Sequence, residues 1–116
     1  MFVDDDPINN RMHELLFAKL YPDIEVLKAT SVDEAIAYLK EHSDHLPSRI
    51  FLDLNLPIKD GWQFLQEFKP LEIKIDIYLL TSSIDILHGH NAHVTEVVKD
   101  FLEKPLRPHQ LKAIFL

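Results

Sequence analysis

The 116-residue sequence contains no cysteine, only two glycines and no long apolar run. Without cysteine there can be no disulfide, no thiolate nucleophile and no Cys-ligated metal centre. A membrane-spanning helix needs about 18 or more apolar residues, so we expect no membrane contact and a cytoplasmic location. Basic residues are also in the minority, with 12 against 19 acidic residues and a net charge of −7. This balance argues against direct nucleic-acid binding by this domain and favours a cation or a basic partner.

The chain has enough apolar residues, 47% of the total, to form a buried core. No internal repeat, low-complexity segment or linker interrupts it, which predicts one domain over residues 1–116. The first apolar segment, Met1–Val3, is short for a first strand, and the last helical segment stops early at Leu116. We therefore expect a domain that is trimmed or frayed at both ends.

The spacing of apolar residues alternates between the strand and the helix period along the chain. Strands are predicted at residues 1–3, 24–29, 50–52, 73–80 and 97–102. Helices are predicted from Pro7 to Leu20, after Ser31, around Trp62, Leu65 and Phe68, at about 84–93, and in a final segment with Leu111 and Ile114. This alternation predicts an α/β fold with a doubly wound, five-stranded parallel sheet in the flavodoxin-like order 2-1-3-4-5 and five flanking helices.

Two helix starts carry specific capping signals. Asp6 is a good N-cap candidate because Pro7 suits the first helical position, where no N–H is needed. Ser31 and Glu34 have the spacing of a capping box. These signals fix where the first two helices should begin.

Polar residues stand where the predicted strands end, namely Asp4 and Asp5, Asp53, Thr81 and Lys104. In a parallel sheet these ends lie along one edge, which is where such folds bind ligands. Three carboxylates at one edge repel each other unless a cation lies between them. Magnesium prefers oxygen ligands, so the sequence predicts a Mg²⁺ site with carboxylate oxygens of Asp5 and Asp53, the backbone carbonyl of Asn55, and Asp4 nearby.

Lys104 and Thr81 extend this prediction from metal binding to chemistry. A lysine ammonium can bind a phosphoryl oxygen, and the Thr81 hydroxyl would lie on the same edge. Together with a carboxylate nucleophile and a metal ion, they predict phosphoryl transfer onto Asp53. Each residue alone has an ordinary explanation as a helix cap, a loop opener or a surface lysine. Their occurrence together, in order and at strand ends, favours the functional interpretation.

Four segments resemble the receiver domain of bacterial two-component response regulators, and the resemblance covers nearly the whole chain. They are Val3–Pro7, Phe51–Pro57 followed by Asp60-Gly61, Leu80–Ser82, and Phe101–Pro105. The resemblance implies that Asp53 accepts a phosphoryl group from a sensor histidine kinase or a histidine phosphotransfer protein. The domain would catalyse its own phosphorylation and dephosphorylation without being a turnover enzyme.

The resemblance also implies roles for individual residues. Thr81 would be the switch hydroxyl, Lys104 would pair with Asp53 or its phosphate, Phe101 would be the aromatic switch residue, and Pro105 would follow a cis peptide bond. The face formed by the expected helix 84–93, the strand 97–102 and the final helix would bind a downstream protein target. The same face is a candidate dimer interface.

Two other functions fit parts of the sequence. A receiver that is never phosphorylated could act as a protein-docking module, although the acids, Thr81 and Lys104 are all present. A haloacid-dehalogenase-like phosphatase needs a second aspartate two positions after the first, where this chain has Asn55. His88, His90 and His93 could suggest a metal site, but their loose spacing is more typical of a solvated helix end.

Overall fold

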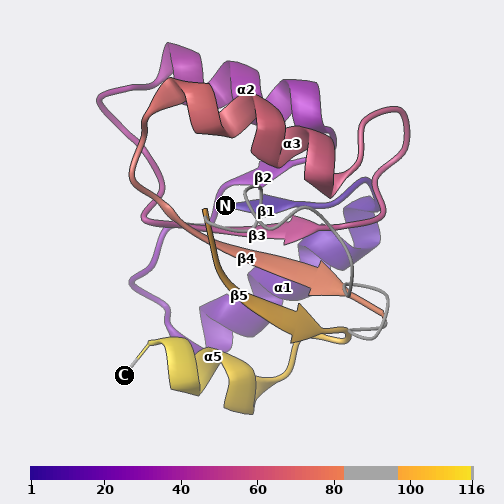
Figure 1. Cartoon of the computed structure of the whole chain (residues 1–116). Helices are drawn as coiled ribbons and strands as arrows, with labels where there is room; N and C mark the ends of the chain where they lie inside the picture. The colour runs from indigo at the N-terminus through magenta and orange to yellow at the C-terminus, as the bar shows by residue number, and fades with distance from the viewer. Residues whose placement is uncertain (83–96, 116) are drawn as a thin grey trace.

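One sheet of five parallel strands runs through the molecule in the order β2-β1-β3-β4-β5 (Figure 1). This computed structural model describes residues 1–82 and 97–115. The strands are β1 (Phe2–Val3), β2 (Lys28–Ala29), β3 (Arg49–Asp53), β4 (Asp76–Thr81) and β5 (Val98–Glu103). The described α-helices are α1 (Pro7–Leu20), α2 (Val32–Glu41), α3 (Gly61–Phe68) and α5 (Pro108–Ile114), and a 3-10 turn spans Lys69–Leu71. The predicted doubly wound, flavodoxin-like strand order is confirmed.

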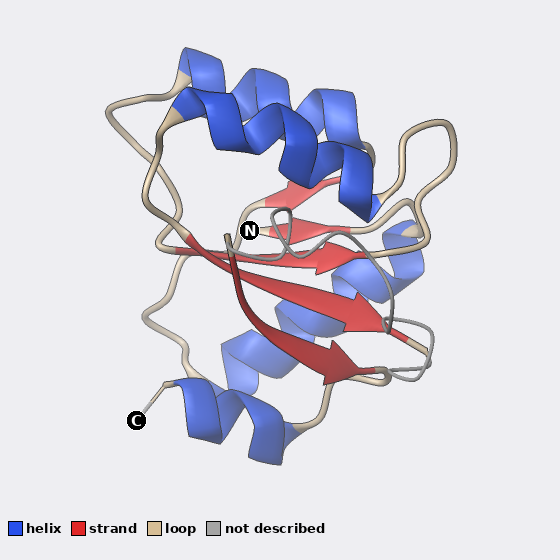
Figure 2. Ribbon diagram, viewed as in Figure 1, coloured by secondary structure: helices blue, strands red, loops and turns tan. Residues whose placement is uncertain are grey.

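Helices cover both faces of the sheet, α2 and α3 on one side and α1 and α5 on the other (Figure 2). Successive strand residues point to opposite faces, so Ile50 and Leu52 pack under α2 and α3 while Phe51 packs toward α1 and α5. Both faces of the central strands are therefore buried. This explains why β3 and β4 are continuous apolar runs rather than alternating ones.

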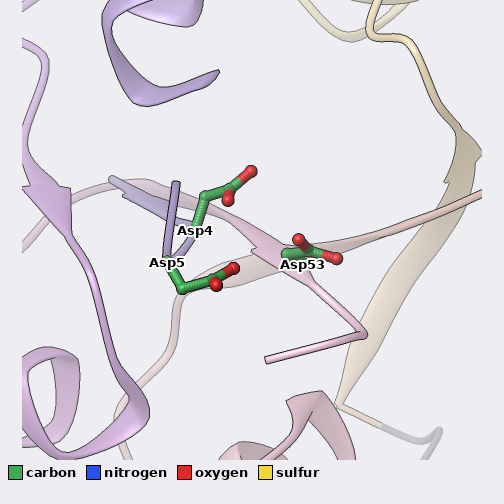
Figure 3. A group of neighbouring side chains, drawn as sticks. All are labelled: Asp4, Asp5 and Asp53. Atoms are coloured by element: carbon green, nitrogen blue, oxygen red, sulfur yellow. The ribbon is translucent and has the colours of Figure 1, made fainter. Parts of the chain in front are cut away.

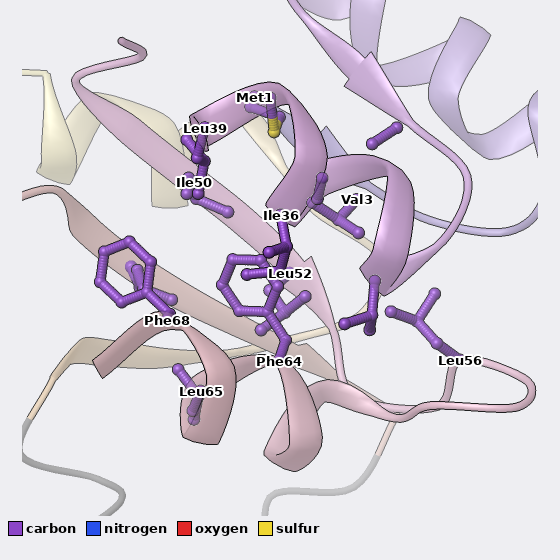
Figure 4. Packing of buried hydrophobic residues seen from close by; sticks show 14 of the residues in the cluster. Met1, Val3, Ile36, Leu39, Ile50, Leu52, Leu56, Phe64, Leu65 and Phe68 are labelled. Carbon is purple, nitrogen blue, oxygen red and sulfur yellow. The ribbon is translucent and has the colours of Figure 1, made fainter. Parts of the chain in front are cut away.

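The two faces have different cores. The α2–α3 core is mostly aliphatic (Figure 4) and consists of Met1, Val3, Ala29, Val32, Ala35, Ile36, Leu39, Ile50, Leu52, Leu54, Leu56, Phe64, Leu65, Phe68, Ile75, Ile77 and Leu79. The α1–α5 core is smaller and richer in aromatic rings, and consists of Phe2, Phe17, Phe51, Tyr78, Leu80, Leu102, Leu106 and Leu111. The rings of Phe2 and Phe51 stack within this core, with centroids 4.9 Å apart.

Helices α1 and α2 begin at the predicted N-cap residues, but the hydrogen bonding of Glu34 differs from the prediction. The Asp6 side chain accepts a hydrogen bond from the Ile8 N–H at 2.9 Å, as expected for the N-cap of α1. The Ser31 hydroxyl accepts from the Glu34 N–H at 3.1 Å. The Glu34 carboxylate, however, accepts from the N–H and hydroxyl of Thr30. The predicted capping box is thus only half formed, because Thr30 offers Glu34 two donors.

Two predicted strand boundaries and one predicted helix face differ in detail from the structure. The strand expected at 24–29 is limited to Lys28–Ala29, because β1 offers it only Phe2 and Val3 as partners. The strand expected at 73–80 begins at Asp76, where it meets Arg49 of β3. In α3, where Trp62, Leu65 and Phe68 were expected on the buried side, Leu65 and Phe68 are buried, but Trp62 is only half-buried and Phe64 is fully buried.

The expected helix at 84–93 lies outside the described residues, together with His88, His90 and His93. The count of five flanking helices therefore stays a prediction, with four α-helices present in the described part of the chain. No helix there combines the length and apolar character needed to cross a membrane.

Candidate functional site

The carboxyl ends of the strands bring the predicted site residues to one edge of the sheet. Asp4 and Asp5 follow β1, Asp53 ends β3, Thr81 ends β4 and Lys104 follows β5. Figure 3 shows the three acidic side chains beside one another at the ends of neighbouring strands. Carboxylate oxygens of Asp4, Asp5 and Asp53 all lie within 4.8 Å of one another. The topology thus assembles residues that are about 50 positions apart in the sequence.

Two of these three carboxylates are removed from solvent. Asp4 is 2% exposed and Asp53 is 4% exposed, whereas Asp5 is exposed. Burial, reinforced by the neighbouring carboxylates of Asp53 and Asp5, raises the pKa of Asp4, although the Asp6 N–H and Lys104 oppose this shift. Within the described residues, Asp4 Oδ2 is buried and has no hydrogen-bond partner. A divalent cation held by these oxygens would relieve the repulsion, so the donor set fits Mg²⁺.

The Asp53 carboxylate is held on both of its oxygens. Lys104 Nζ contacts Asp53 Oδ2 at 2.7 Å, and the Asn55 N–H donates to Asp53 Oδ1 at 3.0 Å. The Lys104 side chain is 27% exposed, so the ion pair sits at the boundary between core and solvent. A charge-assisted contact of this kind orients the carboxylate and places a cation directly beside it.

The ends of β4 and β5 are tied together at the same edge. The Lys104 N–H donates to the Thr81 carbonyl at 2.7 Å, and Thr81 itself is fully buried. Phe101 is half-buried and packs against the α2–α3 core. The Lys104–Pro105 peptide bond is cis, which confirms the expectation for Pro105. Thr81 ends β4, while Phe101 lies within β5 and Lys104 and Pro105 follow it. Of these residues, Lys104 contacts Asp53 directly.

Asp60 and Gly61 start α3 directly against the β3 end. The Asp60 side chain accepts from the Gln63 N–H at 3.0 Å, and Gln63 Oε1 accepts from the Asp60 N–H at 2.8 Å, which forms a complete capping box. A Cβ at position 61 would lie 3.0 Å from Leu54 Cα and 3.1 Å from the Asp53 carbonyl oxygen. Glycine is required here because the helix start packs onto the backbone of Asp53 itself.

The loop between Asp53 and α3 carries Asn55 and two other unusual residues. Ile58 is 98% exposed and has a φ of 66°, a left-handed conformation that costs a β-branched residue free energy. Lys59 reaches Asp33 of α2 at 2.8 Å and Glu67 of α3 at 3.1 Å. These contacts connect the loop to the helices on either side of it. Asn55 itself is exposed, two residues after Asp53.

Two residues that the sequence patterns did not single out border the site. Asn10 on α1 is buried, and its side-chain amide donates to the Asp4 carbonyl at 2.9 Å. His13, one turn later, stacks on Phe2 at a centroid distance of 4.5 Å, and burial together with nearby Lys104 lowers its pKa. The only available signal was indirect: Asn10, His13 and Phe17 share one helix face, which is the face turned to the sheet.

A groove of about 640 Å³ opens beside this edge, between α1 and the segment after β5. Asp4, His13 and Lys104 border it on the side of the carboxylates, and Met12, Leu16 and Leu106 contribute apolar walls. The site is therefore open to a partner from the α1 side.

Comparison with known proteins identifies the family to which this chain belongs. A family model described as "Response regulator receiver domain" matches residues 1–116. The transcriptional regulatory protein FlgR of Helicobacter pylori is 31% identical over 107 residues, which cover 92% of this chain and 26% of FlgR. The transcriptional regulatory protein AruR of Pseudomonas aeruginosa is 32% identical over 120 residues, which cover 96% of this chain and 45% of AruR. The chain thus spans less than half the length of these two relatives.

Solved structures agree with this result. A two-component response regulator from Cytophaga hutchinsonii superposes with a TM-score of 0.85 at 29% identity, covering 98% of this chain and 90% of that one. A CheY-like receiver domain protein from Methanospirillum hungatei superposes with a TM-score of 0.80 at 23% identity, covering 98% and 87%. The second comparison concerns the fold alone.

Proposed function

The chain belongs to the response regulator receiver family, and on that basis we propose that Asp53 accepts a phosphoryl group from a histidine of a partner protein. Receiver domains are signalling modules of two-component systems, and their partners are histidine kinases or histidine phosphotransfer proteins. The observation that carries the proposal is the convergence of Asp4, Asp5 and Asp53 at one sheet edge, with Lys104 Nζ 2.7 Å from Asp53.

The chemistry is a displacement at phosphorus. A carboxylate oxygen of Asp53 attacks the phosphorus of a phosphohistidine and forms a P–O bond. The P–N bond breaks, and its electron pair stays with the donor imidazole. Lys104, which contacts Asp53 Oδ2, neutralises charge on the phosphoryl oxygens, and the Asn55 N–H keeps the carboxylate oriented. Such transfer depends mainly on positioning and charge neutralisation.

Asp5, Asp53 and the carbonyl of Asn55 would hold a Mg²⁺ ion, with Asp4 as a further acid of the site. When bound, the ion supplies positive charge that offsets the charge of both the acids and the incoming phosphoryl group. The three carboxylates within 4.8 Å and the unpartnered Asp4 Oδ2 support this assignment. The repulsion between these carboxylates would then be offset by the bound cation.

Phosphorylation adds about −1.5 to −2 charges beside Thr81 and Lys104. We propose that the Thr81 hydroxyl and the Lys104 ammonium rearrange to contact the new oxygens. The Lys104 N–H bond to the Thr81 carbonyl would couple their movement to β5 and to Phe101. The expected helix 84–93, β5 and α5 would then form the surface that changes for a downstream protein, or for a second copy of the chain.

Exposed apolar side chains on α1 indicate where the phosphodonor approaches. Ile8, Met12 and Leu15 are 69%, 61% and 52% exposed, and Met12 and Leu15 line the groove next to Lys104. Neighbouring exposed apolar residues on a surface commonly mark protein interaction sites. We propose that the donor protein packs over this side, which places its phosphohistidine above Asp53.

Residues 1–116 would act as the receiver domain, and the output would depend on the protein that its changing surface contacts. Because the chain spans less than half of FlgR and AruR, their regulatory activities are not assigned to it. The cysteine-free composition fits a cytoplasmic reaction.

The test is incubation with Mg²⁺ and acetyl phosphate, followed by intact-mass measurement. We expect one added phosphoryl mass on the wild-type chain and none on Asp53→Asn. The matched control is Asp76→Asn, since Asp76 is exposed at the start of β4, the far end of the strand from Thr81.

An added mass that persists in Asp53→Asn would contradict the assignment of the acceptor. No added mass on the wild-type chain, with or without a phosphorylated histidine donor, would support the docking module that is never phosphorylated. Requirement for Mg²⁺ is checked in the same assay by adding a chelator, which should abolish the added mass.

A further inference from the structure

A buried amide on α1 connects the acidic end of β1 to the rest of the fold. Asn10 is 3% exposed and lies on the sheet-facing side of α1. Its Nδ2 donates to the Asp4 carbonyl at 2.9 Å and approaches the Ala29 carbonyl at 3.4 Å. The Ala29 carbonyl also accepts from the Asp4 N–H at 3.0 Å. The ends of β1 and β2 therefore meet at this one side chain.

We propose that Asn10 is a positioning residue for the magnesium ligands, acting through the backbone of Asp4. This inference rests on the proposed function, because it assigns a role toward the ion that the acids would bind. Asn10 contacts neither the ion nor the phosphoryl group in this scheme. It sets the direction in which the acids present their oxygens.

The mechanism follows from the planarity of the peptide bond. The Asp4 carbonyl and the Asp5 N–H belong to the same planar unit, so a hydrogen bond to that carbonyl fixes the orientation of the whole unit. The Asp4 side chain is held separately, since its Oδ1 accepts from the Asp6 N–H at 2.9 Å. Asp5 is exposed, and its direction then depends on the backbone that Asn10 holds.

A purely structural role explains Asn10 less well. Burying an amide costs free energy unless all its groups are bonded, and Asn10 Oδ1 is buried with no hydrogen-bond partner among the described residues. The inward positions of α2 are occupied by apolar residues instead, namely Val32, Ala35, Ile36 and Leu39. An apolar residue at position 10 would avoid this cost but would also remove the donor to the Asp4 carbonyl, so that bond is what the amide provides.

The experiment is a titration of the whole 116-residue chain with Mg²⁺ by calorimetry, alongside urea unfolding. Asn10→Ala removes the amide, and Asn10→Leu keeps the branched shape without hydrogen-bonding atoms. We expect both variants to bind Mg²⁺ about tenfold more weakly, a typical effect of losing a residue that orients metal ligands. If Asn10→Ala fails to fold, Asn10→Leu still gives the comparison.

Two controls separate positioning from general destabilisation. Asn9→Ala removes the neighbouring amide, which is only half-buried. Phe17→Leu weakens the packing of α1 in the α1–α5 core without touching Asp4. Both should bind Mg²⁺ within about twofold of wild type, because neither Asn9 nor Phe17 has a hydrogen bond to the Asp4 carbonyl among those of the described residues.

The outcomes distinguish this inference from the proposed function. Wild-type affinity in Asn10→Leu, or an equal loss in Phe17→Leu, would overturn the positioning role and leave the proposed function intact. No Mg²⁺ binding by the wild-type chain would overturn both. The inference is supported if only the two Asn10 variants bind Mg²⁺ more weakly and each still binds one Mg²⁺ ion per chain.

Discussion

Helices α1 and α2 cover opposite faces of the same sheet but use their residues in opposite ways. Helix α2 buries Val32, Ala35, Ile36 and Leu39, all apolar, in the α2–α3 core. The buried residues of α1 are Asn10 and Phe17, whereas Ile8, Met12 and Leu15 are more than half exposed. Helix α1 thus has a polar group inside and apolar groups outside.

The position of each helix explains the difference. Helix α1 begins directly after Asp4, Asp5 and Asp6, so its inner face meets the site and its outer face borders the groove beside Lys104. Helix α2 follows β2, contributes none of the site residues and packs onto Ile50, Leu52 and Phe64. This placement predicts that the α2 side contributes more to stability and that the α1 side contributes more to the proposed function. Matched substitutions on the two sides test this division.

The largest effect is expected from Leu39→Ala in α2. Leu39 is 1% exposed in the α2–α3 core, and removing such a side chain costs about 2–5 kcal/mol of unfolding free energy. Urea unfolding measures the loss, and Mg²⁺ affinity of the folded variant should stay within about twofold of wild type. A loss much below this range would mean that the α2 side does not dominate stability.

A smaller loss is expected from Lys104→Met on the α1 side. The change leaves the buried Asp53 carboxylate without its cation, which costs about 1–3 kcal/mol. Saturating Mg²⁺ should recover part of this loss, as shown by urea unfolding with and without the ion. The control is Lys59→Met, which breaks exposed ion pairs to Asp33 and Glu67 and should change stability much less. Equal losses of unfolding free energy in Lys104→Met and Lys59→Met would contradict the interpretation that the ion pair of Lys104 with the buried Asp53 matters more than the exposed ion pairs of Lys59.

Asp4→Asn should increase stability in the absence of Mg²⁺. Because burial raises the pKa of Asp4 in the folded state above its ordinary value of 3.8, the ionised carboxylate opposes folding at neutral pH. The penalty is full above the folded pKa and disappears as the pH falls through that pKa and below 3.8. We expect the variant to be more stable than wild type at neutral pH and this advantage to vanish in acid.

Urea unfolding as a function of pH measures the Asp4 effect, and Mg²⁺ should stabilise the variant less than the wild type. Asp33→Asn provides the comparison on α2, because Asp33 is exposed and its substitution should not increase stability. A destabilised Asp4→Asn variant in metal-free buffer would contradict the interpretation.

The smallest effect is expected from Leu15→Ala, the same substitution as Leu39→Ala moved to the outer face of α1. Leu15 is 52% exposed, so its truncation should change the free energy of unfolding by no more than about 0.5 kcal/mol. Urea unfolding checks this, and slower phosphotransfer from a donor protein would show that the exposed side chain serves binding. A loss comparable to that of Leu39→Ala would remove the contrast between the two helices.

Much of the site could be predicted because it depends on the order of elements. The alternation of helices and strands predicted the strand order β2-β1-β3-β4-β5, which the structure confirms. Once that order is known, Asp53 and Lys104 must lie at one edge, and their side chains are 2.7 Å apart. A parallel sheet allows no other placement for residues at the carboxyl ends of its strands.

Other features depend on partners that are remote in sequence. The length of β2 is limited to Lys28–Ala29 because β1 pairs with only those two residues. The inward face of α3 includes Phe64, which packs in the α2–α3 core with Leu39 of α2 and Ile50 of β3. Such contacts leave no signature in local periodicity.

The amino-acid sequence by itself determined the fold, the acidic residues at the strand ends and the lysine that accompanies them. These follow from local periodicity, capping and the rules of parallel sheets. Only the tertiary structure decided which side of α1 faces inward, and therefore that Asn10 holds the Asp4 carbonyl while Ile8, Met12 and Leu15 face solvent. The reason is physical: a helix bearing apolar residues on several sides is oriented by what it packs against.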